Sequence, residues 1–121
     1  MALLRIRLEL ARTAEFPEGS NRHGYEFVAP LNGDGHLDQA DWQAHRQDCR
    51  VRRFWAGDTD EHGHLVHRGK GWAFHYEDTD EEDEPIFRFD LHRFAEGEYV
   101  SITEHDGEQR TFRVVSVRPV D

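Results

Sequence analysis

Short segments in which apolar and polar residues alternate recur along most of the chain, and this pattern restricts the fold more than any other feature. In the first such segment, Leu4, Ile6 and Leu8 alternate with Arg5 and Arg7. Alternation with a period of two places one set of side chains on each face of a strand, so it predicts a half-buried β-strand. The expected strands cover residues 4–10, 25–29, 51–55, 65–68, 72–77, 87–91, 99–104 and 110–118.

One segment favours a helix instead, at residues 39–48. Asp38 suits the N-cap position, and Trp42, His45 and Cys49 would share the inner face. Many short antiparallel strands favour closure, because a closed barrel has no free edges. We therefore expect a mostly β fold, a small antiparallel barrel or strongly curved sheet with one short α-helix. The alternative is an α+β fold in which the helix packs on a curved antiparallel sheet.

The chain has 121 residues and a formal net charge of −10. This length suits one domain, residues 1–121. Residues 77–84 read EDTDEEDE and carry seven of the ten net negative charges, so the acidity does not exclude an anionic ligand elsewhere. Because like charges repel and such a segment buries little, we expect a mobile acidic loop at residues 77–85.

Cys49 is the single cysteine, so the chain cannot form an internal disulfide, and we interpret it as a small buried apolar side chain. The first residues alternate Arg with Leu or Ile, whereas a signal peptide needs an uninterrupted apolar stretch. We therefore expect a cytoplasmic protein with no membrane partner. The modest apolar content, 36% of residues, is compatible with burial of surface in a homodimer.

Four stretches of the chain resemble a small group of conserved bacterial proteins, mainly from alphaproteobacteria, that have no assigned function. These stretches are EFPEGSNRHGYEFVAPL (15–31), CRVRRFWAG (49–57), HLVHRGKGWAF (64–74) and GEYVSITEHDGEQRTFRVVSV (97–117). The resemblance implies a bacterial, cytoplasmic protein, and it assigns no functional residue. Separately, the last stretch resembles the closing hairpin of many small barrels.

Histidine is unusually frequent, with nine residues in the chain. If Gly69 and Lys70 form a two-residue turn, His64 lies directly opposite His75 on the neighbouring strand. Two such imidazoles can share a metal ion, with a carboxylate from the preceding turn as third ligand, which would suit Zn or Fe. The candidate metal ligands are His62, His64, His67 and His75. The alternative is that these side chains are solvated or form ordinary hydrogen bonds.

Arginine gives a second candidate site. Arg50, Arg52 and Arg53 lie beside Trp55, and arginine next to aromatic rings can hold a phosphate or single-stranded nucleic acid. The alternative is that these arginines form the polar face of a strand and pair with acids. The chain has 15 basic residues against 25 acidic ones, so it lacks the basic footprint of a nucleic-acid-binding protein, and we do not expect nucleic acid as partner.

The sequence contains no nucleophile elbow, phosphate-binding loop, dinucleotide-binding fingerprint or paired-cysteine metal motif. Whether the protein is an enzyme stays open. The best prediction is a non-enzymatic ligand-binding or protein-interaction module of the bacterial cytoplasm. The alternatives are a small metal-dependent enzyme that uses the His62, His64, His67 and His75 cluster, and an Arg-lined barrel that binds single-stranded RNA.

Overall fold

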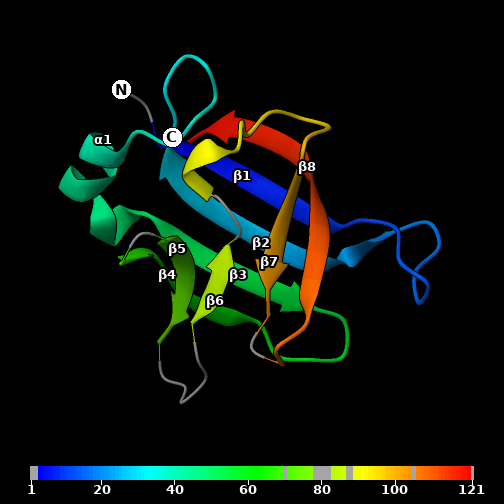
Figure 1. Ribbon diagram of the computed structural model, residues 1–121. Helices are drawn as coiled ribbons and strands as arrows, with labels where there is room; N and C mark the ends of the chain where they lie inside the picture. Colours follow the sequence, from blue (N-terminus) through cyan, green and yellow to red (C-terminus); the bar gives the residue numbers. More distant parts are fainter. Residues whose placement is uncertain (1–2, 70, 78–82, 87–88, 105, 121) are drawn as a thin grey trace.

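The chain forms a closed antiparallel barrel of eight strands, each paired with its neighbours in sequence order (Figure 1). The computed structural model describes residues 3–69, 71–77, 83–86, 89–104 and 106–120. β8 pairs with β1 and closes the barrel, which confirms the expected fold class. The strands are β1 (Leu3–Leu10), β2 (Ser20–Pro30), β3 (Arg50–Trp55), β4 (Glu61–Arg68), β5 (Gly71–Tyr76), β6 (Glu84–Ile86), β7 (Tyr99–Thr103) and β8 (Gln109–Pro119).

Alternation along the strands fills the barrel with apolar side chains. On β1, Ile6 and Leu8 point inward and are buried, whereas Arg5 points outward and is exposed. Aromatic rings fill the middle of the barrel. The ring centroid of Phe74 on β5 lies 5.2 Å from the ring centroids of both Tyr25 and Phe27 on β2. The period-two pattern of the sequence therefore predicts correctly which face of these strands is buried.

A short helix, α1 (Gln39–Ala44), covers one end of the barrel (Figure 1). Asp38 caps it as predicted, because its side chain accepts a hydrogen bond from the Asp41 amide at 3.0 Å. The helix is shorter than the expected 39–48, since His45 leaves the helical conformation and a 3₁₀ turn, η1 (Arg46–Asp48), follows. This change of direction carries Cys49, which is fully buried, into the core at the start of β3.

The predicted strand at 87–91 is wrong for the residues that the structure describes there. The sixth strand lies earlier, at Glu84–Ile86, and a 3₁₀ turn, η2 (Phe89–Leu91), follows it. Phe89 is buried against Trp72 and Phe94, but Leu91 is 66% exposed. The alternation of Phe87, Phe89 and Leu91 predicts a strand face, whereas the 3₁₀ turn brings Phe89 into the core and leaves Leu91 exposed. Phe87 lies outside the described residues.

Most of the predicted acidic loop, residues 78–82, lies outside the described residues. The residues at its end depart from the expectation that the segment buries little, because Glu84 and Pro85 belong to β6 and Glu84 is fully buried. Its burial requires partners inside the barrel, which are described below.

Two glycines allow strands to approach closely on the barrel wall. A Cβ atom on Gly24 would lie 2.0 Å from the carbonyl oxygen of Leu8, and one on Gly63 would lie 1.9 Å from that of His75. Phe54 is the cross-strand partner of Gly24 and projects outward. The guanidinium carbon of Arg7 lies 4.3 Å from the ring centroid of Phe54. These positions therefore need glycine because of strand packing.

Candidate anion-binding face

β3 divides the predicted arginine site between the outside and the inside of the barrel. Arg50 and Arg52 project outward, whereas Arg53 points inward and is only 5% exposed. Trp55 contacts Arg53, because the guanidinium carbon of Arg53 lies 4.4 Å from the centroid of the indole ring. The four residues therefore belong to two separate environments.

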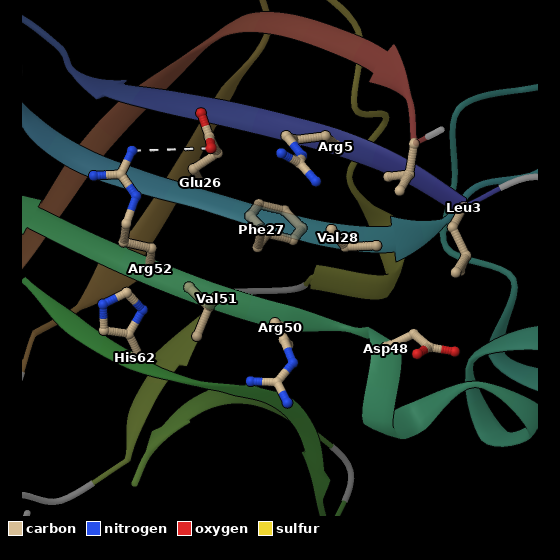
Figure 2. A pocket seen from close by; sticks show the side chains of 11 residues that line it. Leu3, Arg5, Glu26, Phe27, Val28, Asp48, Arg50, Val51, Arg52 and His62 are labelled. Atoms are coloured by element: carbon tan, nitrogen blue, oxygen red, sulfur yellow. Dashed lines mark ion pairs between the residues drawn. The ribbon is translucent and has the colours of Figure 1, made fainter.

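The two outward arginines line a pocket on the outer face of β1–β4, which we call the arginine groove (Figure 2). Its volume is about 380 Å³, within the range of roughly 300–1,000 Å³ that is typical of small-molecule sites. It is lined by Leu3, Arg5, Glu26, Phe27, Val28, Asp48, Arg50, Val51, Arg52, His62 and Val120.

The arginines of this groove differ in how their charge is satisfied. Arg52 donates a hydrogen bond to Asp60 at 3.0 Å and lies 3.8 Å from Glu26. Arg5 and Arg50 have no ion pair or side-chain hydrogen bond with any residue that the structure describes. The residues directly opposite Arg5 on the neighbouring strands are Val28 and Arg118, neither of which is acidic. The carboxylates that line the groove belong to Glu26 and Asp48.

Apolar side chains lie close to these two arginines. Figure 2 shows Val28 of β2 between Arg5 on one side and Arg50 on the other, with Leu3 nearby. Leu3, Val28 and Val120 are only partly buried, so they present apolar surface to the groove. The groove thus combines guanidinium groups, which bind carboxylates and phosphates in a planar fork, with apolar side chains.

A network of charged side chains lies inside the barrel at the end opposite α1. Arg53 donates a hydrogen bond to Glu104 at 2.7 Å and one to Glu61 at 3.4 Å, and its Nε lies 3.7 Å from Glu84. Arg110 lies 3.4 Å from Glu104. We call Arg53, Glu61, Glu84, Glu104 and Arg110 the buried ion cluster.

Two tyrosines complete this cluster, because the hydroxyls of Tyr25 and Tyr76 both donate hydrogen bonds to Oε1 of Glu84, at 3.0 and 2.5 Å. Burial and the nearby Glu84 charge raise the pKa of both tyrosines well above the usual range. Burial also raises the pKa of Glu104, although its hydrogen bond with Arg53 opposes that shift. The cluster therefore holds buried charge by mutual pairing.

Aromatic side chains cover this end of the barrel. The ring of His23 lies 4.7 Å from Phe16 and 4.5 Å from Trp55, and its Nδ1 is 2.6 Å from the hydroxyl of Ser20. Burial lowers the pKa of His23. This covering layer separates Arg53 from the solvent.

The β4–β5 hairpin has the register that the two-residue turn predicts. His64 is the cross-strand partner of His75, and Arg68 pairs with Gly71. The two rings, however, contact different carboxylates, since Nδ1 of His64 lies 2.6 Å from Glu77 and Nδ1 of His75 lies 2.7 Å from Asp83.

The other two candidate ligands lie elsewhere. His67 points inward and stacks on Trp72 with ring centroids 4.5 Å apart, and His62 is the cross-strand neighbour of Arg52. Within the described part of the chain, no group of three or more His, Cys, Asp or Glu side chains is arranged to hold a metal ion. Metal binding by His62, His64, His67 and His75 stays a prediction, which a Zn²⁺ titration of the parent protein and of His64→Ala tests.

No protein-family model, curated protein or solved structure matches this chain. Across the residues that the structure describes, none of the helices combines the length and the apolar character needed to cross a membrane.

Proposed function

We propose that the protein is a non-enzymatic binding module of the bacterial cytoplasm that holds a small anion with a short apolar tail in the arginine groove. The observation that carries this proposal is the position of Arg5 and Arg50. Both lack a partner among the described residues, and both line a groove with the apolar side chains of Leu3, Val28 and Val120.

The contrast with the other arginines supports an anionic ligand. Arg7, Arg52 and Arg53 each lie within 4 Å of carboxylates, as expected in a chain with 25 acidic residues. At the groove, Arg118 lies beside Arg5 and adds positive charge, although the chain as a whole is acidic. A carboxylate or phosphate monoester would receive hydrogen bonds from these guanidinium groups.

The apolar part of the groove favours an amphipathic small molecule over single-stranded RNA. RNA binding on a sheet relies on exposed aromatic rings that stack with bases. Phe54, on the outer face of β3, is buried beneath Arg7 and Arg52. Leu3, Val28 and Val120 can instead contact a hydrocarbon chain.

Isothermal titration with octanoate and with octyl phosphate tests the proposal. We expect Arg5→Gln and Arg50→Gln each to weaken binding about tenfold, because each removes a charge-assisted hydrogen bond. Val28→Ser should weaken octanoate binding but not that of acetate. Arg22→Gln is the matched control, since Arg22 is exposed on β2 and lies outside the groove. Equal weakening by Arg22→Gln, or no binding by the parent protein, contradicts the proposal.

A further inference from the structure

A second groove lies on another part of the barrel wall, between the β1–β2 loop and the outer face of β1, β8 and β7. Its volume is about 900 Å³, and we call it the tyrosine groove because Tyr99 lines it. Arg12, Glu18, Asn21, Thr111 and Arg113 also line it. It shares no lining residue with the arginine groove.

The wall that the β1–β2 loop contributes is held by several hydrogen bonds. The amide of Ala11 donates to the carbonyl of Thr111 at 3.0 Å, and the amides of Thr13 and Gly19 both donate to the carbonyl of Phe16 at 2.9 Å. Gly19 has a φ of 77°, and a Cβ atom there would lie 2.7 Å from the Leu10 carbonyl oxygen. The loop is therefore packed directly on β1, so this wall exists before any ligand binds.

Tyr99 offers a ring to the groove. It is 57% exposed, and Leu91 is the other large apolar side chain with such exposure in the described part of the chain. Tyr99 is also the cross-strand partner of Arg113 in the β7–β8 pair. A flat ring stacked on Tyr99 would therefore lie next to a guanidinium group.

The charge of Arg113 is not satisfied by its neighbours. Glu9 is its cross-strand partner on β1, but Glu9 pairs with Arg7 at 2.8 Å. Neither Arg113 nor Arg12 has an ion pair or side-chain hydrogen bond with the described residues. Two guanidinium groups in one groove are suited to a phosphate, which accepts several hydrogen bonds from planar donors.

We infer that the tyrosine groove binds a nucleoside monophosphate. Its base stacks on Tyr99, and its phosphate contacts Arg113 and Arg12. Glu18, Asn21 and Thr111 supply polar groups for the sugar hydroxyls. Stacking on an aromatic side chain tolerates any base, since every base has a π-face, so the inference specifies the class of ligand rather than one nucleotide.

Titration of the parent protein with AMP, observed by NMR or calorimetry, tests this inference. AMP should bind more tightly than adenosine or ribose 5-phosphate, each by about fivefold or more, because each lacks one of the two contacts. Tyr99→Ser should weaken AMP binding about fivefold or more, and Arg113→Gln about tenfold. Arg93→Gln, a change of equal charge at an exposed residue outside both grooves, should leave the affinity within twofold.

Three outcomes would overturn the inference. One is no AMP binding at 10 mM, roughly the weakest affinity such contacts allow. Another is weakening by Arg113→Gln without any effect of Tyr99→Ser, which would show simple attraction of an anion. The third is binding of oligouridylate without binding of AMP, which would indicate an RNA chain. Because Arg5→Gln/Arg50→Gln leaves this groove intact, unchanged AMP binding by that variant separates this site from the arginine groove.

Discussion

The carboxylate of Glu84 accepts hydrogen bonds from Tyr25 and Tyr76, which come from β2 and β5. Replacing Glu84 by Ala would leave two buried hydroxyls without this acceptor and would remove one of the carboxylates that balance the charge of Arg53. We expect Glu84→Ala to lower the free energy of unfolding by about 3–5 kcal/mol, as measured by urea denaturation.

Acetate provides a control for this prediction, because it can replace the missing carboxylate. It should raise the stability of Glu84→Ala more than that of the parent protein. Glu61→Ala should cost less, since Glu61 is partly exposed and water can solvate the groups that it leaves. Parent-like stability of Glu84→Ala would contradict the role of Glu84 in the buried ion cluster.

Glu104 gives a prediction about pH. Its pKa in the folded protein is raised, mainly by burial, so the folded state holds this proton more tightly than the unfolded chain. The stability contributed by Glu104 is therefore complete below the unfolded pKa of about 4.5, and it is lost as the pH rises through the folded pKa. Glu104→Gln cannot ionise, so its stability relative to the parent should increase with pH above that value. Urea denaturation from pH 4.5 to 7.5 measures this difference, and the opposite slope would contradict the raised pKa.

Helix α1 covers one end of the barrel, and Trp42 is the residue through which it packs there. The indole lies 4.7 Å from the ring of Trp72, and its N–H donates to the carbonyl of Leu65 at 3.2 Å. We expect Trp42→Ala to cost about 3–5 kcal/mol in chemical denaturation, because it leaves a cavity at the barrel end.

Trp42→Phe keeps much of the packing and removes only the indole donor. It should cost clearly less than Trp42→Ala, at about 1–2 kcal/mol. A similar loss of stability from both substitutions would show that the hydrogen bond to Leu65, and not packing, holds helix α1 against the barrel.

The glycines of the barrel wall test how tightly the strands of the whole molecule pack. Gly24→Ala and Gly63→Ala each place a methyl group against a backbone carbonyl that cannot move without its strand. We expect each to cost about 3 kcal/mol, the upper end of typical overpacking effects, in thermal or urea unfolding. Gly33→Ala is the control, because nothing lies within 4 Å of its added Cβ atom, and it should change stability little. Equal stability of all three variants would contradict the close strand approach.

Local features of the molecule could be predicted from the sequence, whereas contacts between distant segments could not. The turn at Gly69 fixes the pairing of His64 with His75, since hairpin register depends on a few neighbouring residues. The direction of each ring depends on Glu77 and Asp83, which the register does not determine. The alternation of β1 likewise predicts its buried face.

Arg53 illustrates the limit most clearly. In the sequence it belongs with Arg50 and Arg52, and a charged residue on a strand usually faces water. It lies inside because Glu84 and Glu104, 31 and 51 residues further along the chain, pair with it. The arginine site predicted from the sequence lacked Arg5 for the same reason, since Arg5 reaches the groove through the pairing of β1 with β2.

The order of the strands has a consequence for how the barrel forms. Seven of the eight strand pairs join consecutive strands, but β1 pairs with β8, so Leu4 meets Pro119 across almost the whole chain. Closing so long a loop costs chain entropy before the pair gains any contact, so this seam should form last. The ends that flank the seam are close, as the Val120 amide donates to the Leu3 carbonyl at 3.1 Å. A circular permutant that joins them through a short linker and opens at Gly57 would make the seam a hairpin and leave β3–β4 as the distant pair, so the step that limits the folding rate should move from one side of the barrel to the other.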